Sequence, residues 1–410
     1  MISMEKTWLC RAPLVIPVST PPIENGAVLV HGDKIAAVGH YSHLKGVVPP
    51  GTNVLDIEEG LIMPGLVNCH SHLTLSWMKD KIERGLGFSG WLRQLMGLNA
   101  TASQEQYVEA LQFGMGLSKK AGTVLLGDVL NSPVFSPSIM ESTVREDSMF
   151  IHFFLEVIHP KALWFDTNDM VRCLEEFFIS WSLSAHSVYT CSRQALCAIK
   201  AFCQEKGLTF SIHVAESREE LEFVTRGKGP IAEILREKNR DVDGFFRSSP
   251  SPVRLLDEEG LLDEKTMCVH CTFLDDTDLD ILGSRGAWVC LCPESNLYIS
   301  GSMPRIDKIV QKVERICFGT DSLASNSNLS ILSQLRAAFR AYPSIEPAIL
   351  FKAATLGGAK ALGFERFFGS LTEGATARFL ILRYMPCKAH EVFEFLCSES
   401  VEERIEQFEP

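Results

Sequence analysis

Eight apolar runs of strand length, separated by segments with helical spacing, are the feature that most constrains this chain. Each run is apolar almost throughout, which is typical of parallel strands covered on both faces. Eight strand–helix units predict an α/β fold, a (β/α)8 TIM-type barrel, whose site lies at the carboxyl ends of the strands. The predicted strands are 61–67, 122–129, 148–158, 181–190, 208–217, 266–274, 287–296 and 315–323.

The segments between the runs place apolar residues near helical spacing, and several begin with a Ser, Thr or Asp that can cap a helix. The helices predicted most clearly are 103–120, 167–178, 192–207 and 275–286. The insertion 226–262 is too long for an ordinary connection. It favours either a helix-containing lid over the site or a solvated excursion.

Both ends of the chain differ from this pattern. Residues 28–39 alternate apolar side chains around Gly32-Asp33, which predicts a hairpin, and residues 369–384 again indicate paired strands. We therefore predict two domains. Residues 1–60 and 366–410 form a small β-sandwich, and residues 61–365 form the catalytic barrel.

Histidines and a carboxylate stand at the ends of three of the runs. His70 and His72 are two residues apart, so on a strand they point to the same side, although two polar residues closing a strand would give the same pattern. His213 and Asp321 end later runs. Three imidazoles and one carboxylate can hold a divalent metal and leave a position open for water, whose pKa the metal lowers to about 7. We predict this metal site.

Two further residues at strand ends are candidates for catalysis. Glu216 follows His213 by three residues and is predicted to shuttle protons, although it could instead be the first carboxylate of the next helix. His270 is predicted to contact the attacking water or the substrate, or else to be a core histidine. Asp321 can also accept a proton from the water.

Three more residues near the carboxyl ends of the predicted strands are candidates for contact with substrate. His186 ends the fourth run and is predicted to contact substrate. Ser295 and Asn296 follow the seventh run, where they either line the mouth or cap a loop.

Composition excludes several classes of partner and indicates a compartment. The 410-residue chain has a formal charge of −12 and no Lys/Arg-rich run, so a nucleic-acid backbone is not expected as a partner. No stretch approaches a membrane span or a secretory signal. The 13 cysteines lie among apolar segments, which favours buried thiols and a reducing cytoplasm.

These motifs together resemble the amidohydrolase superfamily, specifically its mononuclear-metal deaminase and chlorohydrolase branch. The resemblance rests on PGLVNCHSH, SAHSVYT, HVAES, VHC, CPESN and FGTDSLASN, which stand in order at the predicted strand ends. It implies one metal ion, zinc or in some relatives iron, and the same site residues: His70, His72, His213, Asp321, Glu216, His270 and His186. It also implies a homodimer, since relatives often form one.

Within that branch the chain looks most like aminodeoxyfutalosine deaminases, which are similar to S-adenosylhomocysteine and methylthioadenosine deaminases. The motif GFSGWL, which contains Trp91, is part of this likeness. The reaction implied is attack of a metal-activated water on C6 of adenine, with Glu216 protonating N1 and ammonia leaving. Trp91, His186, Ser295 and Asn296 would contact the nucleoside.

Two departures and three alternatives accompany this resemblance. Ala100 stands where S-adenosylhomocysteine deaminases carry a ribose-binding Glu, and Gly374 to Arg378 departs from a Gly-x-x-Ala-Asp pattern far from the chemistry. The alternatives are deamination of S-adenosylhomocysteine, methylthioadenosine or adenosine, hydrolysis of a triazine or guanine, and a non-catalytic barrel that serves as a binding module.

Overall fold

The computed structural model describes residues 6–130, 149–158, 180–240 and 242–410. The predicted helix 167–178 lies outside these residues. The chain divides into two compact units, one of residues 1–68, 118–125 and 330–410 and the other of residues 69–117 and 126–329. The domain boundaries placed at 60/61 and 365/366 stay predictions.

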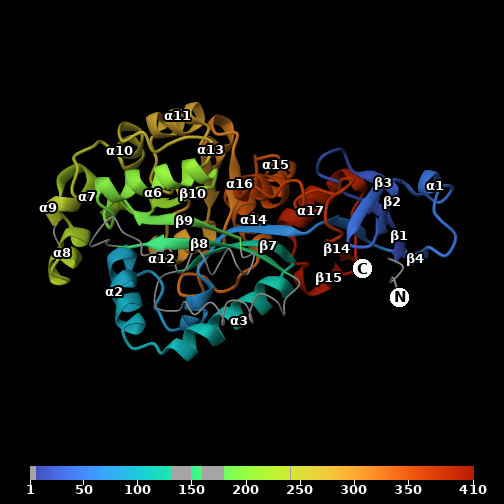
Figure 1. Ribbon diagram of the computed structural model, residues 1–410, viewed down its shortest axis with the longest axis horizontal. Helices are drawn as coiled ribbons and strands as arrows, with labels where there is room; N and C mark the ends of the chain where they lie inside the picture. The colour runs from blue at the N-terminus through green and yellow to red at the C-terminus, as the bar shows by residue number, and fades with distance from the viewer. Residues whose placement is uncertain (1–5, 131–148, 159–179, 241) are drawn as a thin grey trace. The chain divides into compact units, whose positions relative to one another are not determined.

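Eight strands form a parallel sheet in the order β13-β12-β11-β10-β9-β8-β7-β6 (Figure 1). The sheet closes into a barrel where β13 returns to β6, because the His70 carbonyl accepts the backbone N–H groups of Thr320 and Asp321 at 3.0 Å. The predicted barrel is confirmed. Its strands are β6 (Leu66–Ser71), β7 (Thr123–Leu130), β8 (Phe150–Val157), β9 (Ser180–Ser187), β10 (Phe210–Val214), β11 (Thr266–His270), β12 (Trp288–Leu291) and β13 (Ile316–Phe318).

The run 61–67, predicted as one strand, is two. β5 (Leu61–Pro64) pairs with a C-terminal strand, and only β6 enters the barrel. The break falls at Pro64-Gly65. A side chain at Gly65 would meet the Val124 side chain at 2.2 Å, so only glycine allows this close approach.

Two of the predicted helices begin at side chains that cap them. Ser192 accepts the Ala195 N–H at the start of α6, and Gly207 ends that helix with φ of 67°. Asp275 and Asp278 form a capping box at the start of α11. The described helices of the barrel unit are α2 (Gly87–Asn99), α3 (Gln104–Lys120), α6 (Arg193–Lys206), α7 (Arg218–Arg226), α8 (Pro230–Glu237), α9 (Val242–Phe245), α10 (Pro252–Glu258), α11 (Asp276–Arg285), α12 (Pro293–Ser300) and α13 (Ile306–Lys312).

Strands from both chain ends form a separate seven-stranded sheet in the order β15-β14-β5-β1-β2-β3, with β4 paired to β1. The predicted hairpin is β2–β3, with His31 opposite Lys34 and Gly32 in the left-handed region. These strands are β1 (Thr7–Val15), β2 (Ile23–His31), β3 (Lys34–His40), β4 (Asn53–Asp56), β5, β14 (Phe379–Leu382) and β15 (Ile405–Phe408).

The same unit contains α1 (Tyr41–Leu44), α14 (Ile331–Ala341), α15 (Pro347–Lys352), α16 (Gly358–Leu362) and α17 (Val392–Ser398). The core under its sheet is apolar and includes Val28, Ile62, Phe379 and Phe408.

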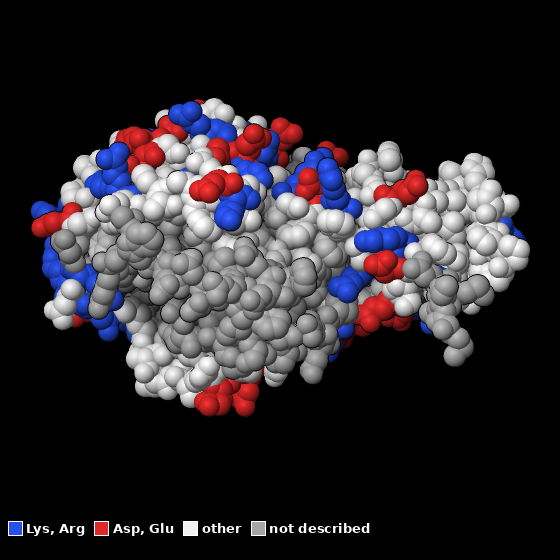
Figure 2. All heavy atoms as spheres, viewed as in Figure 1, with Lys and Arg blue, Asp and Glu red and all other residues white. Residues whose placement is uncertain are grey.

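No helix among the described residues has both the length and the apolar composition needed to cross a bilayer. On the face drawn in Figure 2, Lys and Arg side chains lie among Asp and Glu side chains and do not gather into one basic patch. Cys268, Cys271, Cys290 and Cys292 are buried and free, as expected for structural thiols.

Candidate active site

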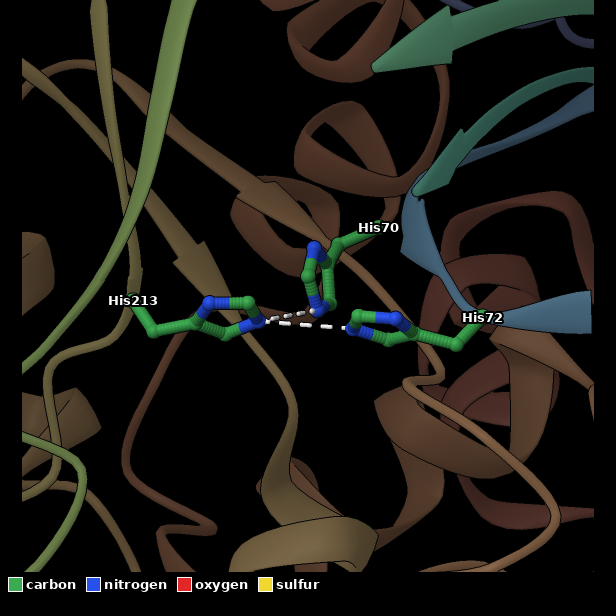
Figure 3. A group of neighbouring side chains, drawn as sticks. All are labelled: His70, His72 and His213. Carbon is green, nitrogen blue, oxygen red and sulfur yellow. Dashed lines mark hydrogen bonds between the residues drawn. The ribbon is translucent and has the colours of Figure 1, made fainter. Parts of the chain in front are cut away.

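Three histidines bring their Nε2 atoms together inside the barrel (Figure 3). His213 Nε2 lies 3.3 Å from His70 Nε2 and 3.4 Å from His72 Nε2. Asp321 Oδ1 lies 3.8 Å from His70 Nε2 and 3.7 Å from His72 Nε2. The structure therefore brings together all four predicted metal-ligating residues, which are up to 251 positions apart in the chain.

The spacing and protonation of these side chains fit a divalent metal. Two nitrogen ligands at about 2.0–2.1 Å from a tetrahedral zinc ion lie about 3.3 Å apart, close to the spacing seen here. Burial lowers the pKa of His70 and His213, and it lowers the pKa of His72 to about 4. The rings are therefore neutral at pH 7 and present lone pairs to one point.

Hydrogen bonds fix which nitrogen of His213 faces that point. Its Nδ1 lies 2.7 Å from the His186 carbonyl oxygen, which can only accept, so Nδ1 carries the proton and Nε2 the lone pair. Glu156, His186 and His213 also lie close enough for a second metal. Since His213 Nδ1 already donates to a carbonyl, these three residues support the first site and do not form another.

Asp321 is held in its ionised form. Burial alone would raise the pKa of Asp321, but the neighbouring His72 and His270 rings and the hydroxyls of Ser295 and Ser325 lower it below its ordinary value. Both hydroxyls donate to Asp321 Oδ2 at 2.6 Å, which leaves Oδ1 facing the imidazoles. Asp321 also has a φ of 56°, a strained value for a non-glycine residue that the barrel closure maintains.

Glu216 and His270 lie beside the metal-ligating side chains. His270 Nε2 is 3.5 Å from Glu216 Oε1, and the Asn296 amide nitrogen donates to His270 Nδ1 at 3.2 Å. Burial, and next the charge of Asp321, raise the pKa of Glu216 well above its ordinary value. Burial lowers the pKa of His270 to about 3. A carboxyl group with a raised pKa beside an imidazole is suited to giving and taking back a proton.

A cavity of about 240 Å³ opens onto these groups. His186 and Trp91 both line it, and the Trp91 indole N–H donates to the Ala324 carbonyl at 2.9 Å. Ser295 and Asn296 are not among its lining residues, because their side chains are buried behind it against Asp321 and His270. The structure gives these two residues contacts with Asp321 and His270, and their predicted contact with substrate stays a prediction.

The described part of the insertion 226–262 contains α8, α9 and α10, and residues of α8 line the cavity. Its closure as a lid stays a prediction.

Three acidic residues of the site were missed in the sequence. Glu156 ends β8 with Oε1 3.8 Å from His213 Nδ1. Glu220 accepts the Glu216 backbone N–H at 2.8 Å, and Asp128 accepts the Leu73 N–H at 2.8 Å just beyond His72. Glu156 and Asp128 are carboxylates near the ends of apolar strands, and that signal could have identified both.

Comparison with known proteins agrees with this geometry. Residues 61–403 match the amidohydrolase family. The chain is 25% identical to a 5-methylthioadenosine/S-adenosylhomocysteine deaminase of Thermodesulfovibrio yellowstonii, covering 92% of this chain and 85% of the relative. It is 27% identical to an aminodeoxyfutalosine deaminase of Deinococcus radiodurans, covering 82% and 81%.

The fold is also that of a solved adenosine deaminase from Xanthomonas campestris with bound zinc. The TM-score is 0.80 at 22% identity, covering 97% of this chain and 90% of the other. Because the family match spans most of the chain and includes all four predicted metal-ligating residues, this protein belongs to the amidohydrolase family of hydrolytic enzymes.

Proposed function

We propose that this enzyme removes the 6-amino group of an adenine nucleoside as ammonia, and that its substrate is 6-amino-6-deoxyfutalosine, an intermediate of menaquinone biosynthesis. The observation that carries the proposal is Glu216 beside His270, next to three converging imidazoles at the floor of a cavity. The two curated relatives, one named for methylthioadenosine and S-adenosylhomocysteine and one for aminodeoxyfutalosine, support the adenine class.

In this proposal His70, His72, His213 and Asp321 hold one divalent metal ion, Zn²⁺, with Fe²⁺ as the alternative. Three imidazoles and one carboxylate would hold the ion and would leave a position for water, as in catalytic sites. When bound, the metal lowers the pKa of a coordinated water to about 7 and so supplies a nucleophile at neutral pH. The zinc in the Xanthomonas campestris structure supports this choice.

Glu216 moves the protons that the reaction requires. Water adds to C6 of the purine, and the C6–N6 bond then breaks, so N1 and the departing nitrogen must both be protonated. Because burial raises the pKa of Glu216, its carboxyl group can donate a proton to N1. The resulting carboxylate can take one proton from the attacking water and pass it to the leaving amine. One water is consumed and one ammonia is released.

The remaining residues orient these groups. His270 donates from Nε2 to the oxygen that attacks C6, while Asn296 fixes the ring through Nδ1. Asp321 accepts the second proton of that oxygen through Oδ1. This proton replaces the one that Glu216 gave to N1, so that both carboxyl groups return to their starting states. Trp91 and His186, which line the cavity, pack against the purine and the sugar.

Ammonia release from a panel of nucleosides tests this proposal. The metal-loaded enzyme is incubated with aminodeoxyfutalosine, S-adenosylhomocysteine, methylthioadenosine and adenosine, and the kcat/KM values are compared. We expect aminodeoxyfutalosine to have the highest value. Turnover of a chlorinated triazine or of guanine, with no ammonia from any 6-aminopurine nucleoside, would replace the proposal with that alternative.

A further inference from the structure

The cavity has two chemically different parts. Its floor is polar and consists of His72, Glu156, His186, His213, Glu216, His270 and Asp321. One wall, in contrast, is apolar and is formed by two helices, α2 and α8. Figure 1 shows both helices at the same end of the barrel unit. The side chains of this apolar wall are Leu92, Leu95 and Met96 from α2 and Ile231, Ile234 and Leu235 from α8.

The sequence explains why both helices face the cavity with apolar side chains. In each helix the three residues have the spacing i, i+3, i+4, which places them on one face. An ion pair between Arg93 of α2 and Glu237 of α8 links the helices, with Arg93 Nη2 3.0 Å from Glu237 Oε1. The two apolar faces line the same cavity and together form one wall.

Two polar residues line the cavity at the C-terminal ends of α2 and α8. Lys238 is the residue directly after α8, and Asn99 is the last residue of α2; both line the cavity. The Tyr107 hydroxyl donates to Asn99 Oδ1 at 2.6 Å, so the Asn99 amide nitrogen remains as the hydrogen-bond donor of that side chain. Lys238 and Asn99, called the rim below, therefore both offer N–H donors.

The charges of the cavity are separated. Among the described residues that line it, Lys238 is the only Lys or Arg. The carboxylates Glu156, Glu216 and Asp321 each lie within 3.8 Å of a histidine nitrogen of the floor. A ligand that extends along the apolar wall thus leaves the carboxyl groups of the floor and meets the positive charge of Lys238 at the rim.

We propose that Lys238, with Asn99, selects substrates whose 5′ substituent is apolar along its length and ends in a carboxylate. This inference rests on the proposed function, because it assumes an adenine ring at the floor. An uncharged methylthio group contacts part of the apolar wall but forms no ion pair with Lys238. A 5′ substituent that ends in an ammonium group meets Lys238 as a like charge.

The alternative role of Lys238 is structural, since a cation near a helix C-terminus stabilises the helix. The two roles differ in one measurable respect. A structural lysine affects all substrates alike through folding, whereas a recognition lysine affects only the anionic one. The test therefore compares substrates that differ in that charge alone.

The experiment uses metal-loaded wild-type enzyme and the Lys238→Met variant. Three nucleosides are compared: aminodeoxyfutalosine, its uncharged carboxylate methyl ester, and methylthioadenosine. For the carboxylate substrate we expect KM to rise about threefold to tenfold with kcat unchanged, because one exposed charge-assisted contact is lost. For the two uncharged nucleosides we expect changes of less than about twofold.

Lys228→Met is the matched control, because Lys228 is exposed just before α8 and is not among the cavity's lining residues. It should change no KM. Lys238→Glu should raise KM for the carboxylate substrate further than Lys238→Met does, and the sensitivity of wild-type KM to salt should disappear in both variants.

Equal changes for charged and uncharged substrates, or no change for the carboxylate substrate, would overturn the assignment of Lys238. That result would leave the deaminase activity standing. If wild-type enzyme released no ammonia from any of the three nucleosides, the proposed function itself would fail.

Discussion

The barrel and the chain-end sheet bury different kinds of side chain. The core of the chain-end sheet is apolar, and its largest residues, Phe379 and Phe408, stack with ring centroids 4.5 Å apart. The barrel unit buries apolar residues too, but near the carboxyl ends of its strands it also buries His70, His213, His270, Glu216 and Asp321.

Because of this difference, we expect the sheet core to contribute mainly to stability and the barrel site mainly to catalysis. Burying ionisable groups costs free energy unless they are hydrogen-bonded, paired or bound to a metal, and the shifted pKa values of His270 and Glu216 reflect that cost. The apolar sheet core bears no such cost. Substitutions in the barrel site should therefore change metal binding and turnover, while substitutions in the sheet core should change the free energy of unfolding.

The largest expected effect follows His213→Ala. The variant removes one of three converging imidazoles, so we expect loss of both bound metal and turnover, measured by elemental analysis and ammonia release. His31→Ala is the control, since His31 is an exposed residue of the chain-end sheet and should keep both. Retention of one equivalent of metal by His213→Ala would contradict the ligand assignment.

Glu216→Gln should come next. It keeps the size of the side chain and removes the acid, so we expect turnover to fall about 10²- to 10⁴-fold with metal content unchanged. Elemental analysis measures the metal content of the variant, and ammonia release measures its turnover. If the variant lost its metal, Glu216 would be a ligand and the proton shuttle would have to be reassigned.

Ser295→Ala should have an intermediate effect. Its hydroxyl donates to Asp321 Oδ2 at 2.6 Å, and loss of such a supporting contact to a metal ligand typically costs 10- to 100-fold in affinity or activity. Metal titration and kcat/KM measure the loss, and exposed Ser284→Ala serves as control. Unchanged metal affinity together with a raised KM would instead restore the predicted substrate contact.

Phe379→Ala should affect turnover least and stability most. Phe379 is fully buried, so its truncation should cost about 3–5 kcal/mol in the free energy of unfolding, measured with denaturant. Turnover per folded, metal-loaded molecule should stay unchanged, and Phe379→Leu should lose less stability. A large fall in turnover of the folded fraction would contradict the separation between the two regions.

The barrel could be predicted because its signals are local. Continuous apolar runs, helix caps such as Ser192 and polar residues at strand ends are all readable along the chain. The convergence of His70, His72, His213 and Asp321 could be predicted for the same reason, since a barrel places the carboxyl ends of all its strands on one face. The run 61–67 was misjudged because the break at Gly65 depends on a contact with Val124, which is distant in sequence.

The amino-acid sequence by itself determined the barrel, the pairing of the chain ends and the identity of the converging histidines, Asp321 and Glu216. Only the tertiary structure decided that Ser295 and Asn296 form hydrogen bonds with Asp321 and His270, and that α2 and α8 share an apolar wall ending at Lys238. The physical reason is that periodicity specifies which side of its own element a side chain occupies. What lies opposite that side depends on packing between elements far apart in the chain.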